Sequence, residues 1–344
     1  CQPGGPGAPL PQDHFVFFQH AGFFDVREII VHADYDFPLA DLALIKLSSP
    51  VVGIAPTRIN TTSSPVFGTT ASIVGYGTSG GTAADAGLKR VGAISTTSCG
   101  TPQDDASFVC WNFEDPVGPP GGDSNICNGD SGGPMLVEAG GELELAGVNC
   151  GQFCPNDDCL PPAFSISQNV YGYRAWIESN AGSDLGQTRC GQIPQVGESG
   201  TQISGFVGSV DATDPEVAYS FSIPADSGAL RVGLNGQIPI ATNLADFDLF
   251  VGADEVPTPP SWECVSSGPL AFEYCEIDSP DAVDWAALVS RMSGSGEYQL
   301  TVTTIPEPKG ATPLAAALTT LCLVARSRHG RQARTDRPRQ GWPS

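Results

Sequence analysis

The chain has 344 residues and a formal net charge of −22, with 41 glycines, 30 prolines and 11 cysteines. This length accommodates two ordinary domains, and the abundance of glycine and proline indicates an all-β protein with many turns. The acidic balance argues against a nucleic-acid partner, because the phosphates would be repelled. The cysteines favour an oxidising compartment over the cytosol.

An aspartate opens the first clear apolar strand. Residues 41–47 read Asp-Leu-Ala-Leu-Ile-Lys-Leu, and residues 30–36, Ile-Val-His-Ala-Asp-Tyr-Asp, lead into them. The next expected strand, residues 71–74, ends in a Gly-Tyr-Gly turn at residues 75–77. An aspartate before an apolar run is ordinarily a cap or turn residue, so Asp41 gains meaning only from the segments that follow it.

A serine lies in a glycine-rich turn at residues 127–134, which read Cys-Asn-Gly-Asp-Ser-Gly-Gly-Pro. A serine hydroxyl needs a positioned base, and it needs backbone N–H groups that bind the oxyanion formed on attack. Flanking glycines let the backbone bend sharply and let a carbonyl group come close. The pattern indicates Ser131 as a nucleophile, with the N–H groups of Gly129 and Ser131 as oxyanion donors.

This turn resembles the signature of the trypsin/chymotrypsin-like serine proteases, and other segments follow that family in order. They resemble its stretch before the buried aspartate, its Gly-aromatic-Gly turn, its cleft strand and its closing helix: residues 30–36, 75–77, 145–149 and 173–177. The resemblance implies two six-stranded β-barrels over residues 1–180 and a catalytic role for Asp41 beside Ser131. It also implies that the substrate is a protein or peptide.

The resemblance further implies which residues shape the substrate pocket. Asn125 matches the base of the pocket, and because it is neutral we do not expect a preference for Arg or Lys. Asn149 belongs to the cleft strand, and Pro162 is expected to narrow the pocket and favour small or apolar side chains. Asp130 matches the aspartate that, in the family, pairs with the new amino terminus after activation cleavage.

The base of the family is a histidine in a small-small-His-Cys context, and no histidine here has that context. The chain has four: His14, His20, His32 and His329. Cys1 precedes Asp41 by a spacing close to that of the cysteine that follows the family's catalytic histidine. We therefore expect the base to precede Cys1 in a longer reading frame. The first barrel is then incomplete, and the 344-residue chain alone has no turnover.

The cysteine pattern carries further expectations. The resemblance implies a Cys99–Cys110 bridge and a bridge from Cys127 to Cys154, with Cys150 and Cys159 as competing partners. A zinc site built from the last three is an alternative. We expect a local Cys264–Cys275 bridge, and Cys190 has no obvious partner. No cofactor is expected, with structural calcium as an open alternative, although the acid pair Asp157-Asp158 lacks the spacing of a known calcium loop.

A second β pattern follows a polar, glycine-rich linker at residues 181–200. Four segments alternate apolar and polar side chains: residues 217–223, 230–234, 246–251 and 298–302. They predict a β-sandwich over residues 201–305. Residues 218–221, 246–249 and 294–298 resemble the pre-peptidase C-terminal domain, which implies a role in binding or secretion. Asp246 and Asp248 are interpreted as turn and edge residues rather than cation ligands.

The last segment has three parts in a fixed order. Pro-Glu-Pro at residues 306–308 precedes an apolar run at 311–325 and a basic cluster at 326–331. This order resembles a PEP-CTERM sorting signal over residues 306–331, followed by a basic tail at 332–344. It implies an exosortase-type sorting enzyme as partner and transient membrane contact, with the protein secreted or at the cell surface of a Gram-negative bacterium.

These features predict a serine endopeptidase that uses a Ser-His-Asp mechanism in its complete form. Two alternatives stay open. One is a catalytically inactive binding or adhesion protein on the protease fold, and the other is an esterase on the same fold. The residue encoded before Cys1 separates the first alternative from the prediction, and substrate assays separate the second.

Overall fold

A computed structural model describes residues 11–114, 123–155, 159–181, 200–238, 245–253 and 262–307. Contacts between residues group residues 1–307 into one unit and residues 308–344 into another. The apolar run and basic cluster of the expected sorting signal, the basic tail and nearly all of the expected linker lie outside the described residues, as does Cys190. The domain boundaries expected from the sequence therefore stay predictions.

The chain begins, in the described part, with a short 3-10 helix, η1 (Pro11–Asp13), and a three-stranded antiparallel sheet in the order β1-β2-β3. Its strands are β1 (Phe15–Phe18), β2 (Gly22–Val31) and β3 (Ala43–Leu47). Asp41 lies two residues before β3, at the end of the loop that connects β2 to β3. These three strands form an open sheet at the position of the incomplete first barrel, so the first barrel itself stays a prediction.

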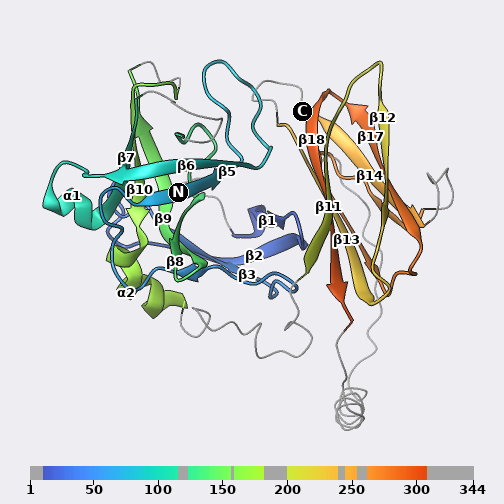
Figure 1. The fold of residues 1–344 in the computed structure, drawn as a ribbon, viewed down its shortest axis with the longest axis horizontal. Coiled ribbons are helices and arrows are strands. Elements are labelled where there is room, and N and C mark those ends of the chain that lie inside the picture. Colours follow the sequence, from blue (N-terminus) through green and yellow to red (C-terminus); the bar gives the residue numbers. More distant parts are fainter. Residues whose placement is uncertain are drawn as a thin grey trace, which may run out of the picture. The chain divides into compact units, whose positions relative to one another are not determined.

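A closed six-stranded barrel follows, with the strand order β10-β7-β6-β5-β8-β9 and a pairing between β9 and β10 that completes the ring (Figure 1). Its strands are β5 (Thr70–Gly75), β6 (Arg90–Thr97), β7 (Phe108–Phe113), β8 (Pro134–Ala139), β9 (Glu142–Phe153) and β10 (Ala163–Asn169). A short strand, β4 (Arg58–Ile59), pairs in parallel with β9. The expected all-β class and the second barrel are thus confirmed.

The interior of the barrel is filled by apolar side chains from several strands. Trp111, Met135 and Ala146 are fully buried there. Gly147 has no room for a side chain, because a Cβ atom would lie 2.8 Å from Ser167 and 3.0 Å from Met135. Two helices, α1 (Pro102–Ser107) and α2 (Val170–Ala181), flank the strands, and α2 confirms the helix expected at residues 173–177.

The remaining strands form two four-stranded sheets, ordered β11-β18-β13-β16 and β12-β17-β14-β15. They are β11 (Thr201–Val210), β12 (Glu216–Ser222), β13 (Ser227–Gly236), β14 (Asp246–Ala253), β15 (Cys264–Ser266), β16 (Phe272–Asp278), β17 (Asp284–Ser293) and β18 (Gly296–Pro306). Side chains from both sheets share one apolar core, which includes the buried Trp285, Phe247 and Tyr298. The predicted β-sandwich is therefore confirmed as a fold.

Three disulfides join described cysteines. Cys99–Cys110 and Cys264–Cys275 form as expected. The expected Cys127–Cys154 bridge is wrong, because Cys127 pairs with Cys159, whose Cα atom lies 5.5 Å away, within the range that a disulfide spans. Cys150 and Cys154 are free thiols, and the alternative of zinc held by Cys150, Cys154 and Cys159 is excluded because the disulfide occupies one of its ligands.

Candidate active site

The nucleophile loop, residues 127–133, is a succession of tight turns that is fastened to β9. Gly132 N–H donates to the carbonyl of Asn149, and Asn149 N–H donates to the carbonyl of Gly133, both at 2.8 Å. Ser131 is exposed at the tip of the loop. Within the described residues its hydroxyl makes no hydrogen bond, so it is open to a base and to a substrate.

Two backbone N–H groups beside Ser131 are also open. In the part of the chain that the structure describes, neither Gly129 N–H nor Ser131 N–H donates to a protein acceptor. The backbone of Gly129 has φ +98°, and a Cβ atom there would lie 3.0 Å from the Cα atom of Gly77. Only glycine fits these two conditions without strain. Unused donors next to an exposed hydroxyl are what an oxyanion requires.

Asp130 fastens the nucleophile loop to the Gly-Tyr-Gly turn. One carboxylate oxygen accepts from Gly77 N–H and the other from Cys127 N–H, each at 2.8 Å. A Cβ atom on Gly75 would lie 1.9 Å from the Asp130 carboxylate, so the turn must be glycine at that position. The two sequence motifs singled out by their glycines are therefore one structural unit.

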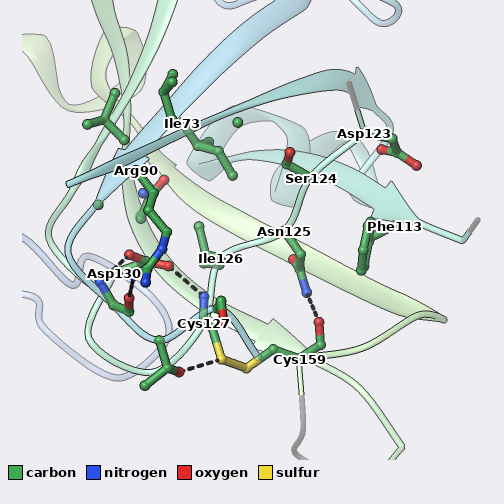
Figure 2. Close-up of a pocket in the computed structure, with 18 of the residues that line it drawn as sticks. Ile73, Arg90, Phe113, Asp123, Ser124, Asn125, Ile126, Cys127, Asp130 and Cys159 are labelled. Atoms are coloured by element: carbon green, nitrogen blue, oxygen red, sulfur yellow. Dashed lines mark hydrogen bonds between the residues drawn. A yellow bond between two sulfur atoms is a disulfide. The ribbon is translucent and has the colours of Figure 1, made fainter. Parts of the chain in front are cut away.

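Arg90 holds the same turn from its other side. Its guanidinium donates to the carbonyl of Gly77 at 2.8 Å and forms a 2.8 Å ion pair with Asp85. Arg90 and Asp130 line a cavity of about 420 Å³, which Figure 2 shows with its other lining residues Cys127 and Asn125. The Gly77 peptide is thus bound at both its N–H and its C=O.

Asp41 is connected to β9 through a cysteine thiol. The Cys150 thiol donates toward the Asp41 carboxylate, with 3.5 Å between Sγ and Oδ2. Burial raises the pKa of Cys150 to about 12, an effect opposed by a hydrogen bond with Gln168 and reinforced by the Asp41 charge. The thiol is therefore protonated at neutral pH and available as a donor. From the sequence alone, Cys150 was expected only as a competing disulfide partner or an alternative zinc ligand.

The strand pairing explains how one strand reaches both groups. On β10, Ser167 lies opposite Asn149 and Ile166 opposite Gly151, so Cys150 is the extra residue of a β-bulge. Bulges of this kind re-aim side chains and are frequent next to active sites. Asn149 fastens the loop that carries Ser131, and the next residue contacts Asp41. The structure therefore brings the two predicted catalytic residues to the same point of β9.

The described histidines whose ring contacts are defined have partners outside this site. The His32 ring packs against Tyr173 and Trp176, with centroid distances of 5.4 and 4.8 Å, and its Nδ1 accepts from the N–H of Asp34 at 3.1 Å. His20 lies in the turn between β1 and β2, where burial and then the Lys89 charge lower its pKa. In the described part of the chain, neither ring contacts Asp41 or Ser131.

The residues expected to shape the pocket are placed differently from one another. Asn125 bonds to three neighbours, Gln152, Cys159 and Ser165, and its bond to the Cys159 carbonyl is drawn in Figure 2. Asn149 is 2% exposed and accepts from the Ser167 hydroxyl at 3.0 Å. Pro162 is exposed just before β10. The structure brings Asn125 together with Gln152, which the sequence analysis did not single out.

Among the described residues, no group of three or more His, Cys, Asp or Glu side chains is arranged to hold a metal ion. In the same residues, no helix is both long enough and apolar enough to cross a membrane.

Comparison with known proteins agrees with this geometry. The model of the trypsin family matches residues 14–177. The chain is 30% identical to trypsin-1 of Astacus astacus over 173 residues, which cover 45% of this chain and 67% of that protein. It is 30% identical to trypsin iota of Drosophila melanogaster over 155 residues, or 43% of this chain and 58% of that protein. The chain belongs to the trypsin family of serine proteases.

Proposed function

We propose that the complete protein is an exported serine endopeptidase that hydrolyses peptide bonds in proteins or peptides. The observation that carries this proposal is that two adjacent residues of β9 contact the two candidate catalytic segments. Asn149 is hydrogen-bonded to the loop of Ser131, and Cys150, the next residue, contacts Asp41. An exposed hydroxyl, two unused N–H donors and a carboxylate are then held by one rigid strand, as nucleophilic catalysis requires.

In the proposed reaction, the Ser131 hydroxyl oxygen attacks the peptide carbonyl carbon and its proton passes to a base. The N–H groups of Gly129 and Ser131 bind the carbonyl oxygen as it becomes negative. The base then gives the proton to the departing amine, which leaves an ester on Ser131. Water, deprotonated by the same base, attacks this ester; the ester bond breaks, the base returns the proton to the Ser131 oxygen, and the acid is released. Asp41 orients the base, and the Cys150 thiol helps to hold Asp41.

A histidine is the side chain suited to accept a proton between Ser131 and Asp41. That it precedes Cys1 stays a prediction. We also propose that the three disulfides form after export, that the β-sandwich serves binding or secretion, and that an exosortase-type enzyme recognises residues 306–331. The disulfides support the export, because such bridges persist mainly in oxidising compartments.

The test compares the protein from the complete reading frame with its Ser131→Ala variant. We expect the parent to cleave casein-derived peptides and to bind a fluorophosphonate probe covalently at Ser131, and the variant to do neither. Failure of the parent to react with the probe and with peptides would favour a binding protein on this fold. Hydrolysis of esters without any cleavage of peptides would favour an esterase.

A further inference from the structure

The β-bulge at Cys150 has a second effect on β9. Beyond the bulge, Gln152 lies opposite Ser165 on β10, whereas before it Asn149 lies opposite Ser167. Because Ser165 and Ser167 are two residues apart on one strand, they face the same side of the sheet. The bulge therefore brings Asn149 and Gln152 to one face of the sheet. On a regular strand, two residues three positions apart would face opposite sides.

The side chain of Gln152 is fixed on that face by hydrogen bonds. Its carbonyl oxygen accepts from the Asn125 amide at 3.1 Å, and its own amide donates toward the Cys159 sulfur at 2.9 Å. Asn125 also donates to the Cys159 carbonyl at 3.3 Å and accepts from the hydroxyl of Ser165, which is fully buried. Both amides of this Asn125–Gln152 pair are thus engaged by defined partners.

The pair is connected to both ends of the nucleophile loop. Asn125 lies two residues before Cys127, where the nucleophile loop begins. The Cys127–Cys159 disulfide joins that loop to Cys159, the residue that both amides contact. Gln152 is three residues beyond Asn149, which binds the other end of the loop. A carbonyl group held by the N–H groups of Gly129 and Ser131 would direct the side chain of its own residue between these two segments.

We propose that the Asn125–Gln152 pair closes the recess beside Ser131, and that the protein cleaves after residues with small side chains such as Gly, Ala and Ser. A large side chain would have to break the pair and leave two half-buried amide groups and the buried Ser165 hydroxyl without their partners, which is costly. A small side chain enters without displacing it. This inference rests on the proposed function, and it makes Gln152 a specificity-determining residue.

The first experiment measures binding, so that it does not depend on turnover. In the Ser131→Ala background of the complete protein, calorimetry compares peptide acids that differ only in their last residue: Ala, Phe or Arg. We expect the Ala peptide to bind at least about tenfold more tightly than the Phe peptide. Gln152→Gly should raise the affinity for the Phe peptide by at least about tenfold and leave the Ala peptide within about threefold.

A matched control removes another side chain from the same strand. Glu142→Gly changes an exposed residue of β9 that pairs with Arg58, far along the strand from the recess. It should leave all three affinities unchanged. If Gln152→Gly fails to fold, as judged by its thermal midpoint, Gln152→Ser provides the same test because its short side chain cannot span the distance to Asn125.

The second experiment measures turnover by the complete protein with Ser131 intact. Amide substrates with the same three residues before the scissile bond should give the same order of kcat/KM. Equal or tighter binding of the Phe or Arg peptide by the parent would overturn the inference, as would an unchanged preference in Gln152→Gly. Binding in the expected order without any turnover would instead overturn the proposed function and leave the closed recess standing.

Discussion

The strand β10 of the barrel and the interior of the sandwich are both buried, but they are built from opposite kinds of side chain. Four of the seven side chains of β10 are polar and fully buried: Ser165, Ser167, Gln168 and Asn169. The sandwich interior is filled by large apolar groups such as Trp285, Phe247 and Tyr298. One strand is built largely from polar groups that water does not reach, whereas the core shared by the two sheets is apolar, although the sandwich also buries a few polar side chains such as Asn235 and Glu273.

Each polar side chain of β10 holds a loop of the candidate site or its support. They bond to Asn125, to Asn149, to the Pro38 carbonyl three residues before Asp41, and to the loops at Ser64 and Ala106. Such bonds add little net stability, because they replace bonds to water, but losing one partner is costly. The buried side chains of β10 therefore serve mainly to position the loops of the candidate site. The buried side chains of the sandwich core serve mainly to stabilise the fold by burying apolar area.

The largest effect expected from this contrast is on turnover. Asp41→Asn should reduce kcat of the complete protein by about 10⁴-fold, because the base loses its orienting charge while the packing is unchanged. Kinetics on the small-residue peptide substrates check this. The control Asp34→Asn, at an exposed aspartate in the same connection, should leave kcat unchanged. Equal losses in both variants would show that the connection, and not the carboxylate, matters.

The next effect is on stability and lies in the sandwich. Trp285→Ala should lower the free energy of unfolding by about 3–5 kcal/mol, because a fully buried indole is replaced by a cavity. Urea titration followed by fluorescence measures it. Trp262 is half-buried against Phe250, so its change to Ala should lower the free energy of unfolding by less. If Trp285→Ala lowers kcat under conditions in which the variant is fully folded, the sandwich core also positions the site and the proposed contrast between the two regions is wrong.

A smaller effect should combine stability with position. Gln168→Ala removes the 2.7 Å hydrogen bond to the Pro38 carbonyl and should cost about 1–3 kcal/mol of unfolding free energy. Because Pro38 precedes Asp41 closely, kcat should fall as well. The exposed Gln202→Ala in the sandwich serves as control and should change neither quantity. Loss of stability with an unchanged kcat would mean that β10 does not position the site.

The smallest effect at neutral pH concerns the Cys150 thiol. Its pKa is raised to about 12 in the folded protein, whereas an unfolded cysteine titrates near 8.5. The stabilising contribution is therefore complete below about pH 8.5 and is lost progressively as the pH rises toward 12. Urea midpoints at pH 7, 9 and 11 should fall less steeply in Cys150→Ser than in the parent. The control Cys154→Ser should keep the parent slope.

The sequence predicted much of this molecule where the signal is local. Alternating side chains located β12, β13, β14 and β18. The family resemblance implied the Cys99–Cys110 bridge, and Cys264–Cys275 was expected as a local bridge. The strand β17 was missed because it is buried on both faces over Trp285–Ala287, which removes the period of two. The Cys127 partner was missed because three cysteines within residues 150–159 have similar separations from it.

The candidate site was predicted only in part, for a related physical reason. Glycine and serine in one turn mark Ser131 locally. The contacts of Cys150 with Asp41 and of Gln152 with Asn125 join residues 109 and 27 positions apart. Both contacts depend on the bulge in β9, and a bulge is defined by pairing with β10, which no local pattern reveals.

The Gly77 peptide, which is held at its N–H by Asp130 and at its C=O by Arg90, has a practical consequence. Arg90, Gly77 and Asp130 line a cavity whose wall also includes Cys127 of the nucleophile loop (Figure 2). A small compound that competed for either bond would release the Gly77 peptide and, through Asp130, shift the oxyanion donors. Because Asn125 lines the same cavity, such a compound should change the preference among substrates as well as lower kcat.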